Sequence, residues 1–148
     1  MRSLEKLAPL GLLLLRIGVG AIFIHHGYPK LFGNTHQAMG MFEHMGFPGY
    51  FVYIAGVLEF FGGIMLIAGL FTRVAGLLLA GEMAVAIWRV HLPQGGIGAM
   101  HNYEFPLALA VASFALATLG AGMISLDHAI YGARSGKISR KSKSSDRD

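Results

Sequence analysis

Three ionisable side chains lie in the middle of long apolar stretches of this chain: Arg16, Glu59 and Glu82. Arg16 and Glu59 are each nine residues from one end of their stretches, and Glu82 is nine residues beyond Arg73, which corresponds to about 13.5 Å along a helix. An ionisable group at this depth in a membrane is costly, and it indicates a functional site. We expect the three side chains to form one buried polar cluster near the membrane midplane.

The expected cluster would hold two carboxyl groups and one guanidinium. Burial and repulsion between carboxylates both disfavour their charged forms, so we expect Glu59 or Glu82 to hold a proton near neutral pH. Such a pair titrates as a unit. Two interpretations follow from the residues: a proton-handling or ligand-binding role, and a purely structural clasp that orients three helices.

A second polar layer is expected nearer the outer surface. Arg89 follows Glu82 by seven residues and so lies on the same helix face, two turns further out. Glu104 begins the last apolar stretch at a similar height. The sequence therefore predicts an ion pair between Arg89 and Glu104.

Most of the histidines fall on the same outer side, including His25, His26, His91 and His101. Imidazole is a common metal ligand. The chain has no His-x-x-x-His spacing, however, and no carboxylate spacing that would complete a site. We predict no metal site and interpret these histidines as polar interfacial groups or proton relays.

Membrane-spanning helices are the elements that must position these residues. A spanning helix needs about 20 mostly apolar residues, and four stretches qualify, over residues 7–26, 50–71, 74–90 and 105–124. Glycine and alanine recur in them at spacings that favour close helix packing. The sequence therefore predicts an all-α membrane protein, built as a four-transmembrane-helix bundle.

The composition excludes several classes of protein. Of the 148 residues, 54% are hydrophobic and 14% are charged, whereas soluble domains carry about 25% charged residues. This argues against a soluble enzyme and against a nucleic-acid partner. The absence of cysteine excludes disulfides and thiol chemistry by the chain itself.

The first outer loop, residues 27–49, contains one further expected element. Ala38, Met41, Phe42 and Met45 recur at helical spacing, which predicts a short amphipathic helix lying at the membrane interface. Its apolar side chains are expected to rest on lipid or on the bundle.

The distribution of basic residues predicts the orientation. Nine of the 12 lysines and arginines lie on one side of the predicted spans, and this side is normally cytoplasmic. Both termini are therefore expected in the cytoplasm, with residues 1–133 forming a single transmembrane domain. Residues 134–148 are expected to form a disordered basic cytoplasmic tail.

Several segments together resemble the DoxX family of membrane proteins. They are LLLLRIGVGAIFIHHGYPKLFG, MGFPGYF, LEFFGGIMLIAGLFTRVAGLLLAGEM, HNYEFPLALA and GAGMISLD. The resemblance covers roughly residues 12–127. Ala121 stands where the closing family pattern has a proline. The resemblance implies a four-helix protein of the bacterial inner membrane, with a thiosulfate:quinone oxidoreductase subunit among its relatives.

These observations lead to one main functional hypothesis. We expect an accessory subunit of a membrane redox assembly, rather than a stand-alone enzyme, with quinone as the candidate ligand. The Arg16, Glu59 and Glu82 cluster would handle the coupled proton. Redox subunits or further copies of the chain are the expected protein partners within the lipid bilayer. A scaffolding protein with a structural polar core, and a small transporter or proton pathway, remain as alternatives.

Overall fold

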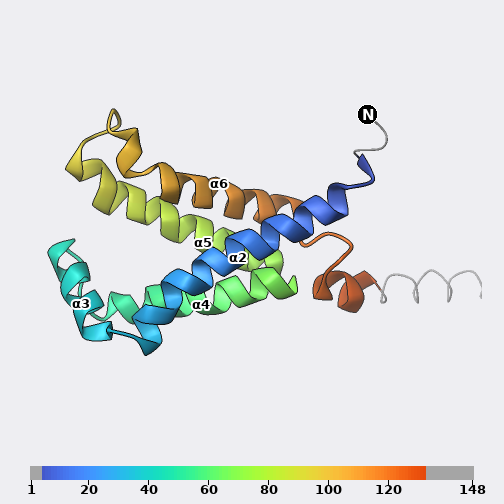
Figure 1. Ribbon diagram of the computed structural model, residues 1–148, viewed down its shortest axis with the longest axis horizontal. Helices are drawn as coiled ribbons and strands as arrows, with labels where there is room; N and C mark the ends of the chain where they lie inside the picture. The colour runs from blue at the N-terminus through green and yellow to red at the C-terminus, as the bar shows by residue number, and fades with distance from the viewer. Residues whose placement is uncertain (1–4, 133–148) are drawn as a thin grey trace, which may run out of the picture.

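The computed structural model describes residues 5–132 as a bundle of helices (Figure 1), and no strand occurs within that range. The main helices are α2 (Ala8–Phe32), α3 (Thr35–His44), α4 (Phe51–Ala68), α5 (Thr72–Ala86) and α6 (Glu104–Leu119). Short helical turns are Ile87–His91, Leu92–Gln94, Met100–Asn102 and His128–Gly132. The predicted all-α class is confirmed.

Three helical segments are long and apolar enough to cross a membrane: Ala8–Phe32, Phe51–Ala68 and Thr72–Gln94. The fourth helix of the bundle, α6, is apolar but has only 16 residues, or about 24 Å. The first span is longer than predicted, because α2 continues through Pro29 to Phe32. Residues 27–32, which were expected in the first outer loop, therefore belong to a helix of the bundle.

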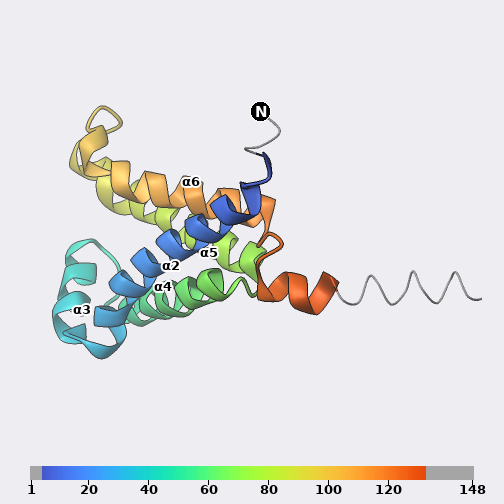
Figure 2. The ribbon, with the colours of Figure 1, turned by 45° about the vertical axis from the view of Figure 1, so that its right-hand side comes forward.

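The bundle consists of two helix pairs. Helix α2 packs mainly along α4, and α5 packs mainly along α6, while α4 and α5 join the two pairs. Figure 2 shows the two pairs diverging toward the end that carries α3. A cavity can therefore form between α4 and α5 at that end.

Glycines allow the helices within each pair to approach closely. A Cβ atom on Gly63 of α4 would lie 2.6 Å from the carbonyl oxygen of Gly20 in α2, and a Cβ on Gly20 would meet the oxygen of Gly63 at the same distance. In the other pair, a Cβ on Gly76 would lie 2.6 Å from the oxygen of Ser113. Backbone contact of this kind is typical of membrane helices.

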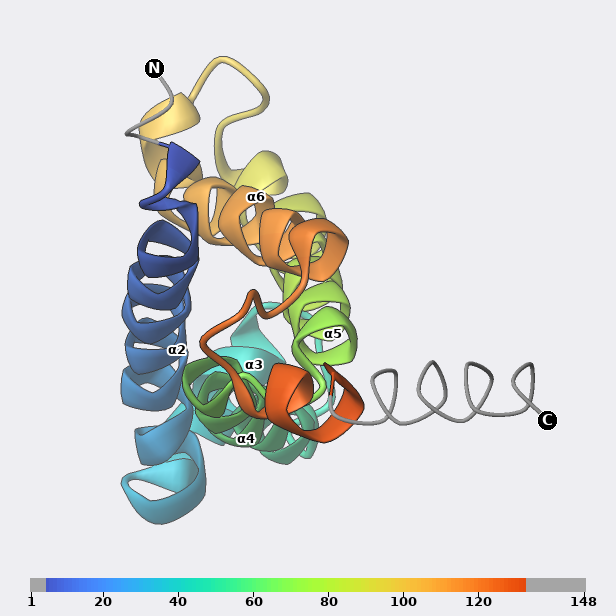
Figure 3. The ribbon, with the colours of Figure 1, turned by 90° about the vertical axis from the view of Figure 1, so that its right-hand side faces the viewer.

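The segment after α6 returns to the turn between α4 and α5 (Figure 3). Asp127 accepts hydrogen bonds from the backbone N–H groups of Phe71 (2.8 Å) and Thr72 (3.0 Å). These donors open α5 and have no partner within their own helix. The segment therefore caps α5 and ties the two helix pairs together at this end.

The expected short helix in the first outer loop is present as α3. Its side chains Ala38 and Phe42, together with Met45 at the helix end, are partly buried, whereas Met41 is exposed. Helix α3 packs against α2 and α4 at the end of the bundle opposite the segment after α6. The predicted tail, residues 134–148, lies outside the described residues.

Candidate functional site

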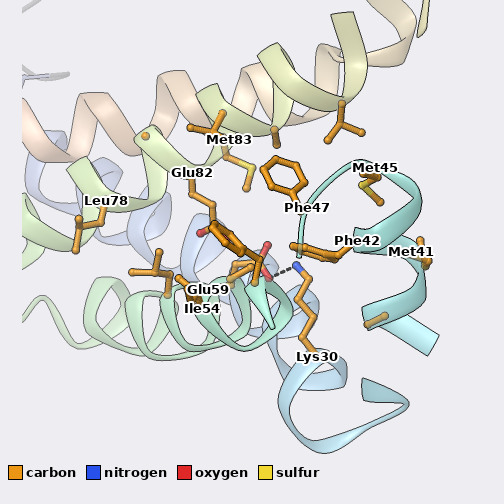
Figure 4. Close-up of a pocket in the computed structure, with 18 of the residues that line it drawn as sticks. Lys30, Met41, Phe42, Met45, Phe47, Ile54, Glu59, Leu78, Glu82 and Met83 are labelled. Carbon is orange, nitrogen blue, oxygen red and sulfur yellow. Dashed lines mark hydrogen bonds and ion pairs between the residues drawn. The ribbon is translucent and has the colours of Figure 1, made fainter. Parts of the chain in front are cut away.

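A cavity of about 480 Å³ lies between α4 and α5, and α3 with the loop after it closes one side (Figure 4). Its wall is mainly apolar. Aromatic rings and methionines contribute much of this wall: Phe42, Phe47, Phe51, Met41, Met45 and Met83. Four ionisable side chains interrupt it: Lys30, Glu59 and Glu82 from three different helices, and His91 from the turn after α5.

The first two of these side chains are Lys30 of α2 and Glu59 of α4, which form an ion pair. The Glu59 side chain is 5% exposed and that of Lys30 is 21% exposed. Gly27 explains how Lys30 reaches α4, because a Cβ there would lie 2.5 Å from the backbone nitrogen of Phe60. The close approach of the two helices thus places the ammonium group beside a buried carboxylate.

The third is Glu82, which extends from α5 into the cavity toward Glu59 (Figure 4). Its Oε2 atom is buried and has no hydrogen-bond partner among residues 5–132. A buried oxygen without a partner is costly, and its presence requires an explanation. A bound molecule that exchanges a hydrogen bond with Glu82 would supply the missing partner.

Aromatic side chains form one part of the cavity wall. The Phe47 ring centroid lies 6.2 Å from that of Phe42 and 5.7 Å from that of Phe51. The guanidinium carbon of Arg89 lies 5.7 Å from the Phe47 ring centroid, within cation–π range. Arg89 belongs to the π-helical turn Ile87–His91 that ends α5, and such turns are frequent at functional sites.

The structure corrects the expected three-residue cluster, because Arg16 lies elsewhere. Its guanidinium donates four hydrogen bonds to backbone carbonyls: Leu66 (2.9 Å), Ile67 (2.9 Å), Ala121 (2.6 Å) and Ile124 (2.7 Å). These carbonyls belong to the end of α4 and to the segment after α6. Arg16 is thus a clasp at the end of the bundle opposite α3, while Glu59 and Glu82 face the cavity.

The expected pair between Arg89 and Glu104 is also absent. Within the described residues 5–132, the only ion pair with a nitrogen–oxygen distance of 4.0 Å or less joins Lys30 and Glu59. Glu104 begins α6 and is exposed. The π-helical turn directs Arg89 toward Phe47 instead, and periodicity extrapolated from a regular α-helix could not have indicated this.

The four singled-out histidines do not form one group. His91 lines the cavity, and its Nδ1 lies 3.0 Å from the carbonyl oxygen of Ala86. His25 and His26 have ring centroids 5.6 Å apart on an exposed face of α2. His101 is exposed in the turn Met100–Asn102. Across residues 5–132, no group of three or more His, Asp or Glu side chains is arranged to hold a metal ion.

Lys30 is the site residue that sequence reasoning missed. It falls in residues 27–49, which were expected to form the first outer loop, whereas α2 continues through Pro29 and Lys30 to Phe32. The available signal was the spacing from His26 to Lys30, which is four residues and places both on one helix face. If the predicted helix had been continued through Pro29, as α2 is in the structure, it would have included Lys30.

Comparisons with known proteins identify the family. The DoxX family model matches residues 11–92. "Putative oxidoreductase CatD" of Bacillus subtilis is 33% identical over 137 residues, which cover 92% of this chain and 99% of CatD. An uncharacterized protein of Haemophilus influenzae is 40% identical over 108 residues, covering 73% of this chain and 75% of that protein.

"Inner membrane protein YqjF" of Escherichia coli is 31% identical over 127 residues, which cover 84% of this chain and 95% of YqjF. No solved structure matches the chain. The family model covers more than half of the chain, and the relatives match along most of their length, with an inner-membrane protein among them. This chain is therefore a membrane protein of the DoxX family.

Proposed function

We propose that the cavity between α4 and α5 binds the head group of a lipophilic quinone, and that the chain is an accessory subunit of a membrane redox assembly. The observation that carries this proposal is the buried, unpartnered Oε2 of Glu82 in an otherwise apolar cavity. The name given to the relative CatD refers to redox chemistry, which agrees with this choice.

The cavity suits a neutral ring that carries hydrogen-bond acceptors. Its volume of about 480 Å³ falls in the usual range for small-molecule sites, and Phe42 and Phe47 offer aromatic surface. Lys30 has three N–H donors, and a protonated Glu82 has one O–H donor. The single ammonium group is already paired with Glu59, so the cavity offers no excess positive charge for an anionic ligand.

The carboxyl groups would supply protons. A bound quinone accepts two electrons and two protons, and the electrons come from a reduced redox centre on a partner subunit. Glu82 is placed to give a proton from Oε2, since a buried carboxyl group is a suitable general acid. Glu82 would then take up a proton from water and give the second proton by the same route, with the ion pair of Lys30 and Glu59 in the same cavity wall.

Binding can be measured with the single tryptophan of the chain. The Trp88 ring centroid lies 5.7 Å from the guanidinium carbon of Arg89, which also lies over the ring of Phe47 in the cavity wall. We expect decylubiquinone to quench its fluorescence saturably, and Glu82→Leu to weaken binding about tenfold, the effect of one lost hydrogen bond to a charged or buried group. Glu82→Gln should bind as the unchanged chain does, because its amide keeps a donor.

Glu104→Gln is the matched control, since it removes an exposed carboxyl group away from the cavity. Its affinity for decylubiquinone should equal that of the unchanged chain. Equal affinity in the Glu82→Leu variant, or quenching that rises linearly without saturation, would reject the quinone site.

A scaffolding function is the second candidate, and Arg16 favours it. Its four hydrogen bonds to carbonyls join α2, α4 and the segment after α6, which is a structural role. This interpretation accounts for Arg16, but it does not explain why the Oε2 atom of Glu82 is buried without a hydrogen-bond partner. Two results together would support scaffolding: the unchanged chain binds no quinone, and the Glu82→Leu variant reaches the membrane yield of the unchanged chain.

We also propose that both termini are cytoplasmic, because the basic residues gather on one side of the spans. The chain lacks cysteine, so a single introduced thiol reports its own location. A membrane-impermeant maleimide should label Ile97→Cys in intact cells, because Ile97 is 80% exposed between α5 and α6. Lys143→Cys should be labelled only after lysis, and the reverse pattern would invert the topology.

A further inference from the structure

A second cavity of about 560 Å³ lies at the other end of the bundle. The start of α5, the end of α6 and the segment leading to Tyr131 form it. It shares no lining residue with the first cavity. An inference drawn from it is therefore independent of the proposed quinone site.

Arg73 is the only arginine or lysine among the residues that line this groove. Only one nitrogen of its guanidinium forms hydrogen bonds with residues 5–132. Its Nη1 donates to the carbonyl oxygens of Ala117 (3.1 Å) and Thr118 (2.7 Å), which caps the end of α6. Within residues 5–132, its Nε and Nη2 have no hydrogen-bond partner. These two nitrogens form an edge that can bind a phosphate group through two parallel hydrogen bonds.

Gly120 leaves this edge uncovered. An added Cβ at Gly120 would lie 3.2 Å from Nη2 and 3.3 Å from Nε of Arg73. The residue has a φ of +83°, in the region where glycine is favoured. The turn that ends α6 thus keeps side-chain atoms away from the two unpaired nitrogens.

The one carboxylate in the groove does not compete for Arg73. The two oxygens of Asp127 accept hydrogen bonds from the backbone nitrogens of Phe71 and Thr72. Asp127 is thus held at the start of α5 and forms no ion pair with Arg73 at 4.0 Å or less. His128 adds a further potential donor to the lining.

The surroundings of Arg73 are apolar and exposed. Phe71 is 50% exposed, Leu119 63% and Met123 67%, and all three line the groove. Side chains of this kind at the end of a membrane helix favour acyl chains over water. Free phosphate would leave them without a partner, whereas a phospholipid would cover them.

We propose that this groove is a binding site for an anionic phospholipid. The phosphate accepts hydrogen bonds from Nε and Nη2 of Arg73, and the acyl chains lie along Leu119 and Met123. A net-negative head group is favoured over a zwitterionic one, because Arg73 has no ion-pair partner among residues 5–132.

The test uses a bimane label attached through Leu119→Cys in the otherwise cysteine-free chain, reconstituted in phosphatidylcholine vesicles. Quenching by brominated phosphatidylglycerol is compared with quenching by brominated phosphatidylcholine. We expect about a fivefold preference for phosphatidylglycerol, the scale of one charge-assisted pair at a partly exposed site. The same label at Val111→Cys, an exposed position on α6 outside the groove, should show no preference.

Arg73→Gln should abolish the preference at position 119 and leave quenching at position 111 unchanged, which also reports that the variant is folded. Arg73→Lys keeps the charge and loses the forked geometry, and it serves if the glutamine variant does not assemble. Its preference should fall to about twofold or less. An unchanged preference in a folded variant, or no preference in the unchanged chain, overturns the proposal.

A further experiment distinguishes a phospholipid head group from free inorganic phosphate as the ligand of Arg73. Millimolar inorganic phosphate, compared with chloride at equal ionic strength, should leave the lipid preference intact. Loss of the preference would assign the site to free phosphate and overturn the assignment to a phospholipid. Neither result bears on decylubiquinone binding at the other end of the bundle.

Discussion

Replacing Arg16 with leucine is expected to lower the stability of the bundle by about 4 kcal/mol or more. The change removes four hydrogen bonds and leaves carbonyl oxygens buried without donors, at a cost of about 1–3 kcal/mol each. Arg16 is 1% exposed, so water cannot replace the guanidinium readily. Against a usual total stability of about 5–15 kcal/mol, this loss removes a large part of the margin, and the membrane yield should fall.

Membrane yield and the midpoint of thermal unfolding in mild detergent measure this effect. Arg89→Leu is the matched control, because Arg89 is exposed and contacts the faces of aromatic rings. It should lower stability by about 1 kcal/mol or less. Equal losses in the two variants would show that the carbonyl clasp contributes little.

Replacing Lys30 with methionine is expected to have the second largest effect, at about 3–5 kcal/mol. Methionine keeps most of the volume of the side chain but removes the only ion-pair partner of Glu59 within residues 5–132. Glu59 is 4% exposed, so its charge would remain buried without compensation. Decylubiquinone binding should also weaken, because an N–H donor leaves the cavity.

The double variant Lys30→Met with Glu59→Met distinguishes the two contributions. Replacing both partners removes the uncompensated charge, and buried pairs replaced by apolar side chains are often neutral in stability. We expect the double variant to unfold at nearly the same midpoint as the unchanged chain while binding decylubiquinone poorly. Additive losses of the two single changes would contradict a direct coupling between Lys30 and Glu59.

The placement error for Arg16 came from measuring depth along one helix at a time. Arg16 and Glu59 are equally far from the ends of their own apolar stretches, which suggested a common depth. In the structure, the first turns of α2 extend beyond the end of α4 (Figure 1). Arg16 therefore lies level with the last carbonyls of α4, whereas Glu59 lies further along the bundle toward α3.

The amino-acid sequence by itself determined the helical architecture. Long apolar runs can satisfy their backbone groups in a membrane only as helices or closed barrels, and the runs here lack strand alternation. The helical spacing from Ala38 to Met45 likewise determined α3, because that period places its apolar side chains on one face. Glycine patterns indicated close packing, which the contacts of Gly20 and Gly63 show.

The tertiary structure alone decided which polar groups meet. Lys30 reaches Glu59 because α2 crosses α4 closely at Gly27, and Glu82 joins them because α5 turns that face toward the cavity. The rotation of each helix, its tilt and its length beyond its neighbours set these distances. Residue spacing within one segment does not determine the rotation, tilt or relative length of a helix, because these depend on how the side chains of different helices pack together.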